Sequence, residues 1–313
     1  MTKIRTRKYR GRDSVVLSTE DLEAVFFTEF GAKLVSLRNL RNGYEFLWQG
    51  TEERHPDAEY GALYTDNDLC GADDIFPSIN ECSYPESPWK GTVCPPHGEL
   101  WSQPWSFEIV DSSVVFLCHG VRFPYEIERR VAYESSTVLV FEYTITNRSP
   151  YPMPGIWAFH PLWNAGDDTA IVLPKGTDQI VCTLDFENRL GRIGSTHAWP
   201  VTIDKCGDSY DLSRFESDCG VCEKFFVDGP LTEGRCRLVR EGPGRSIEMR
   251  FPTDVVGYLG IWKNQGGLLD QNNIAIEPAT GSFDDVSIAH KIGRCSVLPP
   301  NGTWRFRLEF HIE

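Results

Sequence analysis

The stretch TWRFRLEFHI, residues 303–312, alternates large apolar and polar side chains along its whole length. Its apolar members fall at every second position: Trp304, Phe306, Leu308, Phe310 and Ile312. Successive side chains of an extended strand point to opposite faces, so this period of two predicts a β-strand with one face in a core. FEYTIT (141–146) and SIEMRF (246–251) carry the same alternation, which predicts two further half-buried strands.

Turn signals join such strands into hairpins. WSFEIVDSSVVFLC (105–118) predicts a hairpin that turns at Asp111-Ser112-Ser113, and LRNGYEFLW (40–48) contains Asn42-Gly43, a strong short-turn signal. Helical periodicity is weak, and its best segment is a short helix from about Asp284 to Ile292. We therefore expect an all-β protein built as a large antiparallel β-sandwich with few short helices, forming a single domain over residues 1–313.

Composition limits the classes of partner. The chain has 313 residues, 41% hydrophobic and 12% aromatic, with a formal net charge of −14. An acidic chain is a poor electrostatic match to nucleic acid or to anionic membranes, so we expect neither as a partner. The basic start MTKIRTRKYRGRD is followed by no apolar segment, and no stretch has the length of a membrane span. We expect a cytoplasmic protein.

Ten cysteines in a reducing compartment are expected to be mostly free thiols. Cys219 and Cys222 form a C-x-x-C motif, flanked at a distance by Cys206 and Cys236. A zinc site usually has two close pairs of ligands, and only one close pair exists here. No βαβ pattern surrounds the motif, as a redox site would require. We expect these cysteines to be small buried hydrophobes and predict no metal and no cofactor.

The motifs of several enzyme classes are absent. The sequence contains no G-x-S-x-G of serine hydrolases, no phosphate-binding P-loop and no dinucleotide-binding G-x-G-x-x-G. The longest weakly patterned stretch runs from Thr51 to Pro96 and is rich in Pro, Gly, Asp and Glu. Long loops inside a compact domain are usually functional, so this stretch is expected to border a site.

Four polar or aromatic residues stand in glycine- and proline-bounded, aromatic-rich settings. They are His97 in PPHGELW, His160 in GIWAFHPLW, Trp262 in GIWKNQGG and Glu277 in IAIEPATG. Taken singly, each histidine is more often a core or capping imidazole, and each tryptophan is more often core. Together they supply an acid, a base and an aromatic plane that stacks on the C–H-rich face of a sugar ring, which indicates a carbohydrate site.

These four segments, in this order, resemble those of the aldose 1-epimerase, or galactose mutarotase-like, superfamily. The resemblance extends from GAKLVSLRN (31–39) to the C-terminal strand and includes TITNRSPYPMPGIWAFHPLW (144–163). It implies a β-supersandwich and the interconversion of the α and β anomers of a free sugar, without a metal or cofactor. It further implies that Glu277 is the catalytic base, His160 the catalytic acid, and His97 a second histidine that holds the sugar.

Both implied catalytic residues precede prolines, Pro161 and Pro278. The residue before a proline is restricted toward extended backbone conformations. This restriction is consistent with a carboxylate and an imidazole held in one place, as proton transfer requires.

The chain departs from the family pattern at two places. Where relatives carry a sugar- or phosphate-contacting arginine, this chain reads LCGADDIFPSI, with Asp73 and Asp74. Two carboxylates would repel a phosphate at close range, so we expect a neutral sugar, whose hydroxyls the aspartates could contact unless they form an exposed acidic loop. The family also has an aspartate near CEKFF, where Glu223 and Lys224 stand here as unassigned substrate-binding candidates.

Three alternatives stay open at this stage. The chain could be a carbohydrate-binding protein that kept the fold without catalysis, a hexose-6-phosphate mutarotase, or part of a larger polysaccharide-processing enzyme, for which 313 residues are short. The identity of the sugar, and the choice between a monomer and a homodimer, do not follow from the sequence.

Overall fold

The computed structural model describes residues 2–50, 58–67, 69–187 and 189–313, and in this part of the chain strands dominate. Part of the Thr51–Pro96 stretch expected to border a site therefore lies outside the described residues. One α-helix, α1 (Val286–Lys291), and one short 3₁₀ segment, η1 (Tyr64–Asp66), are described. The all-β prediction is confirmed.

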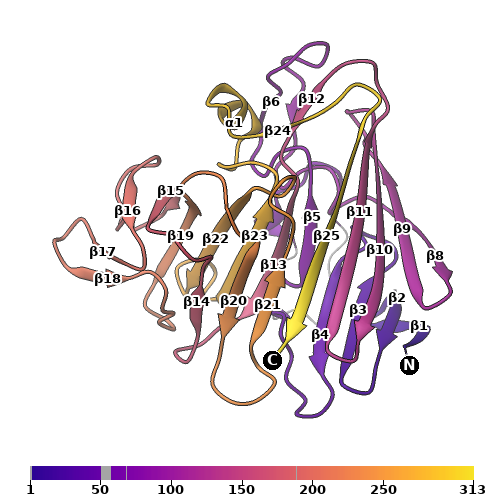
Figure 1. The fold of residues 1–313 in the computed structure, drawn as a ribbon, viewed down its shortest axis with the longest axis horizontal. Coiled ribbons are helices and arrows are strands. Elements are labelled where there is room, and N and C mark those ends of the chain that lie inside the picture. Colours follow the sequence, from indigo (N-terminus) through magenta and orange to yellow (C-terminus); the bar gives the residue numbers. More distant parts are fainter. Residues whose placement is uncertain (1, 51–57, 68, 188) are drawn as a thin grey trace.

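Two large sheets, paired antiparallel throughout, form the body of the molecule (Figure 1). The first has eleven described strands, in the order β1 (Lys3–Tyr9), β2 (Arg12–Ser18), β3 (Leu22–Phe27), β4 (Leu34–Asn39), β5 (Ala72–Ile75), β13 (Ala158–Asn164), β23 (Asn272–Ala279), β22 (Tyr258–Gln265), β19 (Val221–Val227), β15 (Gln179–Asp185) and β16 (Thr196–Ala198).

The second sheet has eight described strands, in the order β14 (Ala170–Val172), β20 (Arg235–Val239), β21 (Ile247–Arg250), β25 (Thr303–Ile312), β11 (Val138–Asn147), β10 (Tyr125–Ser135), β9 (Ser113–His119) and β8 (Ser106–Val110). Three two-stranded ladders complete the fold, made by β12 (Met153–Gly155) with β24 (Ser296–Leu298), β17 (Val201–Ile203) with β18 (Ser209–Asp211), and β6 (Cys82–Ser83) with β7 (Val93–Cys94).

The predicted strand periodicity produces the core between the two sheets. In β25, Trp304, Phe306, Leu308 and Phe310 are buried while Arg305 is exposed. Aromatic rings of the two sheets meet across the interior, as in the pairs Phe141–Phe159 and Trp163–Phe310, whose ring centroids are 5.4 and 5.2 Å apart. The inward face of β13 thus carries Phe159 and Trp163, and the alternate residues of β13 face away from the core.

Local signals agree closely with the structure. β8 and β9 pair with Val110 opposite Ser113, so the hairpin turns where it was predicted. Asn42 and Gly43 do form a turn after β4, although the returning arm makes only isolated bridges such as Arg38–Glu45. α1 begins after Asp285, whose carboxylate accepts hydrogen bonds from the backbone N–H groups of Ser287 and Ile288.

A buried ion pair connects the two sheets. Arg129 of β10 donates to Asp74 of β5 at 2.6 Å, and both side chains are inaccessible to solvent. Trp157 Nε1 donates to the other carboxylate oxygen at 2.9 Å. The guanidinium also lies 4.9 Å from the ring centroid of Phe116, and it donates to the carbonyl of Ala32. Asp74 is therefore a structural residue of the interior.

We predict that Asp74→Ala lowers the free energy of unfolding by about 3–5 kcal/mol, because it leaves the guanidinium of Arg129 buried without its carboxylate. Denaturant titration would show this as a lower midpoint with an unchanged slope. Glu128→Ala, at the exposed neighbour of Arg129, is the matched control and should change stability by less than about 0.5 kcal/mol. A loss of under about 1 kcal/mol in Asp74→Ala would contradict the assigned role.

Candidate active site

A cavity of about 210 Å³ lies on the face of the eleven-stranded sheet that is turned away from the core. Its floor comes from adjacent strands, with His160 and Leu162 of β13, Lys224 of β19 and Trp262 of β22. This volume is below the ~300–1,000 Å³ typical of sites for drug-sized ligands. The cavity therefore suits one small molecule.

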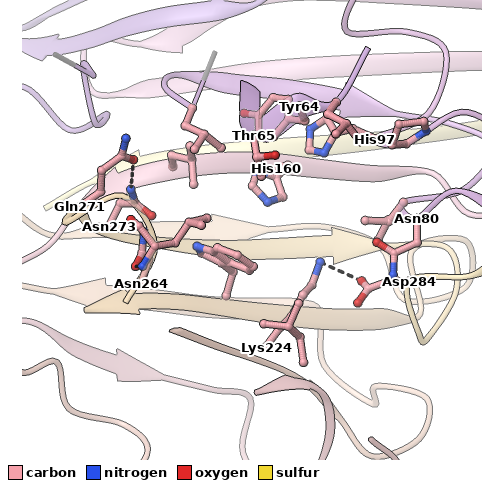
Figure 2. A pocket seen from close by; sticks show the side chains of 18 of the residues that line it. Tyr64, Thr65, Asn80, His97, His160, Lys224, Asn264, Gln271, Asn273 and Asp284 are labelled. Carbon is pink, nitrogen blue, oxygen red and sulfur yellow. Dashed lines mark hydrogen bonds and ion pairs between the residues drawn. The ribbon is translucent and has the colours of Figure 1, made fainter. Parts of the chain in front are cut away.

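The cavity has two polar ends joined by an apolar wall (Figure 2). At one end are the amides of Asn264, Gln271 and Asn273, with Asn273 donating to Gln271 at 3.2 Å. At the other end Lys224 contacts Asp284, beside Asn80. The wall between them includes these side chains: Leu63, Leu162, Leu184, Phe186, Trp262 and Leu268. Such a lining offers hydrogen bonds to hydroxyl groups together with apolar surface for C–H groups.

Three charged side chains meet at the Lys224 end. Lys224 Nζ lies 2.7 Å from Glu277 Oε2 and 2.8 Å from Asp284 Oδ1. Lys224 is opposite Trp262, and Glu277 is opposite Gly260, on the two sides of β22. Glu277 is fully buried, and it lies directly behind two residues that line the cavity, Lys224 and His160.

For both Glu277 and Lys224, burial and the ion pairs shift the pKa in opposite directions. Burial raises the pKa of Glu277, and the ammonium of Lys224 opposes this change. Burial also works against the charge of Lys224, but Asp284 and Glu277 outweigh it and raise the pKa of Lys224 above that of an ordinary lysine. Lys224 is therefore a cation at neutral pH, and Glu277 is a stronger base than an exposed glutamate once it is ionised.

Two imidazoles face this charged group from across the cavity. His160 Nε2 lies 3.5 Å from Glu277 Oε1, and the ring centroids of His160 and His97 are 5.0 Å apart. Tyr64 stacks on His97 with ring centroids 3.7 Å apart and an interplanar angle of 7°. His97 has a positive φ of 61°, an uncommon backbone conformation for a residue with a side chain.

Both imidazoles are neutral at physiological pH. Burial, followed by repulsion from the ammonium of Lys224, lowers the pKa of His160 to about 3. Burial and the neighbouring His160 lower the pKa of His97 well below the ordinary histidine value. The sequence-based expectation of an imidazolium at His160 therefore differs from the lowered pKa in the structure, because burial, and after it the charges of Lys224 and Lys33, disfavour a positive charge on this ring.

The structure gives Asp73 and Asp74 a different role from the one expected. Both are fully buried in β5, and neither is among the residues that line the cavity. Asp73 pairs with Lys33 at 3.0 Å and accepts from the hydroxyl of Tyr64 at 3.0 Å. Asp73 thus acts on the cavity through Tyr64, whereas Asp74 points into the interior. Their burial rules out an exposed acidic loop, and their position does not support the expected contact with sugar hydroxyls.

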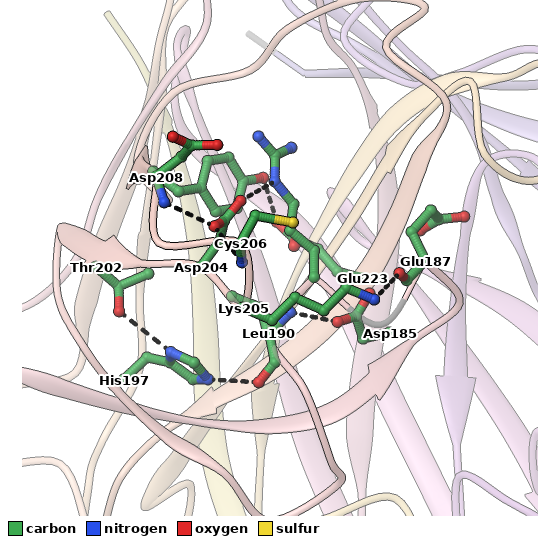
Figure 3. A network of polar contacts seen from close by, with 12 residues as sticks. Asp185, Glu187, Leu190, His197, Thr202, Asp204, Lys205, Cys206, Asp208 and Glu223 are labelled. Carbon is green, nitrogen blue, oxygen red and sulfur yellow. Dashed lines mark hydrogen bonds and ion pairs between the residues drawn. The ribbon is translucent and has the colours of Figure 1, made fainter.

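Glu223 and Lys224 are successive residues of β19, so their side chains point to opposite faces of the sheet. Lys224 and Trp262 line the cavity, but Glu223 projects to the other face of β19. There Glu223 accepts from Tyr210 at 2.6 Å and pairs with Lys263 at 3.3 Å. Figure 3 shows Glu223 near a network of polar contacts that includes Asp185, Glu187, His197 and Asp204. The expectation that Glu223 binds substrate is therefore not supported by its position.

Several cavity residues carried no recognised signal in the sequence. Tyr64 lies in the weakly patterned stretch, and Asp284 follows the IAIEPATG segment by three residues. The amide groups of Asn264, Gln271 and Asn273 lie on β22, β23 and the turn between them. The local signal for this turn was the Gly266-Gly267 pair, which brings both strand ends to one side of the cavity.

The cysteines lie apart from the cavity lining. Cys222 and Cys236 are buried in different sheets, and Cys206 is exposed. Among the described residues no group of three or more His, Cys, Asp or Glu side chains is arranged to hold a metal ion. Within the same residues, no helix has the length and apolar character needed to cross a membrane.

Comparison with known proteins identifies the family. The family model described as "Aldose 1-epimerase" matches residues 13–311. No curated protein sequence matches the chain.

Similar solved structures support the fold. A candidate aldose 1-epimerase from Klebsiella pneumoniae has a TM-score of 0.73 at 14% identity, covering 98% of this chain and 81% of that one. A galactose mutarotase-like protein from Lactobacillus casei has a TM-score of 0.64 at 20% identity, and the match covers 99% of this chain and 100% of that one. A galactose 1-epimerase from Lactobacillus acidophilus has a TM-score of 0.62 at 12% identity, and the match covers 100% of this chain and 98% of that one.

We predict that the His160 ring stays neutral down to about pH 3, its pKa in the folded protein. An unfolded histidine has a pKa near ~6.5, so the unfolded chain binds the extra proton first. The stability contributed by neutral His160 is therefore complete above that value and is lost as the pH falls toward 3. Ring-nitrogen NMR over this range, with His160→Gln to assign the signal, would measure it. Protonation of the folded protein between pH 6 and 7 would contradict the prediction.

Proposed function

Because the chain belongs to the aldose 1-epimerase family, we propose that it interconverts the α and β anomers of a neutral monosaccharide, with Glu277 as the base. The observation that carries this proposal is the state of the Glu277 carboxylate. Oε2 is held by Lys224, while Oε1 has no hydrogen-bond partner in the described part of the chain. One oxygen is fixed, and the other, buried 3.5 Å from His160 Nε2, is the oxygen that we assign to the proton of the C1 hydroxyl.

The reaction needs a proton removed at one oxygen and supplied at another. Glu277 takes the proton of the C1 hydroxyl, the bond from C1 to the ring oxygen breaks, and the ring oxygen is protonated. Rotation about the C1–C2 bond and closure on the other face give the opposite anomer. Proton transfer by a positioned group contributes typically 10²–10⁴-fold to such a rate.

The remaining cavity residues position the sugar. His160 keeps the place that the family resemblance gives to the acid, but as a neutral imidazole it acts by hydrogen bonding. His97 Nε2 has no hydrogen-bond partner among the described residues and is available to a hydroxyl. Trp262 supplies a plane for the C–H face of the ring, and the three amides at the opposite end can bind the distal hydroxyls.

The charge of the cavity supports a neutral substrate. Among the described lining residues Lys224 is the only Lys or Arg, and it is already paired with two carboxylates, Glu277 and Asp284. One cation against two carboxylates leaves a negative balance, which repels a phosphate. This argument replaces the one based on Asp73 and Asp74, whose charges are compensated by Lys33 and Arg129.

The first prediction concerns the base. The wild type should speed the mutarotation of freshly dissolved α-glucose or α-galactose in polarimetry, and Glu277→Gln should lower kcat about 100-fold or more. Glu128→Gln, on the exposed face of β10, is the matched control and should retain full activity. A wild type that is inert across a panel of aldoses would favour the non-catalytic binding protein instead. A folded Glu277→Gln with near wild-type kcat would refute the role of Glu277.

The second prediction concerns substrate charge. For a hexose that the protein accepts, kcat/KM should exceed that of the matching 6-phosphate by at least about tenfold, since a phosphate dianion would enter a site with a negative balance. NMR exchange spectroscopy measures both anomers of each compound directly. Faster turnover of the phosphate would identify a hexose-6-phosphate mutarotase and would overturn the neutral-sugar assignment.

A further inference from the structure

Lys224 occupies a position that a simple counter-ion to Glu277 does not explain. Its ammonium lines the cavity, whereas Glu277 lies behind it. It contacts two carboxylates, Glu277 and Asp284, although one cation suffices to neutralise Glu277. A substrate entering the cavity therefore meets the ammonium directly.

The geometry points to Lys224 as the catalytic acid that protonates the ring oxygen on opening and recovers its proton from the same oxygen on ring closure. This inference rests on the proposed function and deepens it by naming the proton donor. It gives the acid role to a group other than His160, which the family resemblance had suggested.

The hydrogen-bond capacity of the ammonium supports this role. A lysine ammonium has three N–H donors. One donates to Glu277 Oε2 at 2.7 Å, and Nζ also lies 2.8 Å from Asp284 Oδ1 as an ion pair, with no further hydrogen bond of Nζ within the described residues. The third donor is thus available on the side of the cavity. An ordered ammonium with two fixed partners has little freedom, so its remaining N–H is held in one direction.

Among the described titratable groups around the Lys224 end of the cavity, Lys224 is the one that carries a positive charge and can donate a proton. The titratable side chains that face it are Glu277, Asp284, His160 and His97. The two carboxylates keep the proton on Lys224, and both imidazoles are neutral. Neutral imidazole is a far weaker acid than an ammonium, whereas an ammonium can protonate the alkoxide that forms when the ring opens.

The proposed step balances in atoms and charge. Glu277 Oε1 takes the proton of the C1 hydroxyl, and the electrons of that O–H bond form the C1=O bond. The electron pair of the bond from C1 to the ring oxygen moves to the ring oxygen, which takes a proton from Lys224 Nζ. Glu277 is then a neutral acid and Lys224 a neutral amine. Ring closure is the reverse: Lys224 Nζ takes back the proton of the hydroxyl that attacks C1, and Glu277 Oε1 returns its proton to the carbonyl oxygen, which restores both groups.

The test compares variants that keep the charge with variants that remove it. Lys224→Arg keeps a cation beside Glu277, but its proton is much harder to lose. We expect kcat to fall about 100-fold, with KM changed only a few-fold. Lys224→Ala should be equally impaired and should recover at least about tenfold on addition of ethylamine. Lys175→Arg, at an exposed lysine, is the matched control for the arginine change, and wild type with ethylamine is the control for rescue.

The outcomes separate this inference from the proposed function. An inert wild type overturns both. An active wild type with Lys224→Arg within threefold of its kcat shows that Lys224 only holds charge, and it overturns the inference alone. A folded Lys224→Ala variant whose activity ethylamine does not restore would also overturn the inference alone.

A further variant decides the matter if the Lys224 variants do not fold. Asp284→Asn removes one carboxylate that keeps the proton on Lys224, so the pKa of Lys224 should fall. The high-pH limb of the kcat profile, corrected for spontaneous mutarotation, should then move to lower pH by about one unit or more. A limb at the wild-type position would overturn the inference.

Discussion

The ammonium of Lys224 is the charge on which the arrangement of the cavity depends. Two carboxylates, Glu277 and Asp284, are almost completely removed from water on either side of it. Buried carboxylates without a cation would take up protons or move apart, because desolvation disfavours their charge. The lysine thus stabilises the ionised form of Glu277, and it adds to burial, the larger cause, in lowering the pKa values of His160 and His97.

A second buried cation performs the corresponding task inside the sandwich. Arg129 compensates Asp74 between the two sheets, and Lys33 compensates Asp73 beside the cavity. These pairs show why a run of two acidic residues in the sequence does not make an acidic site. Adjacent residues of a strand point to opposite faces, so each aspartate has its own surroundings and its own partner. The same rule separates Glu223 from Lys224 and leaves only the lysine in the cavity.

The fold and the chemistry are linked through the neighbouring strands β13, β23, β22 and β19. Their inner faces carry the aromatic and aliphatic core, and their outer faces carry the cavity. Packing of the inner face therefore fixes the spacing of the outer one, since the interior of a protein is close-packed and yields little. Family membership and a base held by an ion pair both fit sugar epimerisation. Under the proposed function, the amide-lined far end of the cavity is where sugars of different hydroxyl pattern would be distinguished.

The sequence by itself determined the strand content, the hairpin at Asp111, the short helix near Asp284 and the family. These follow from local alternation, turn chemistry and ordered motifs, which need no knowledge of distant contacts. It also marked His97, His160, Trp262 and Glu277, which the structure brings to one place around the cavity. Only the tertiary structure decided which charges are buried together. Lys224 meets Glu277 and Asp284 across 53 and 60 residues of chain, and the proton affinities of Lys224 and Glu277 depend on burial and on partners that no local pattern encodes.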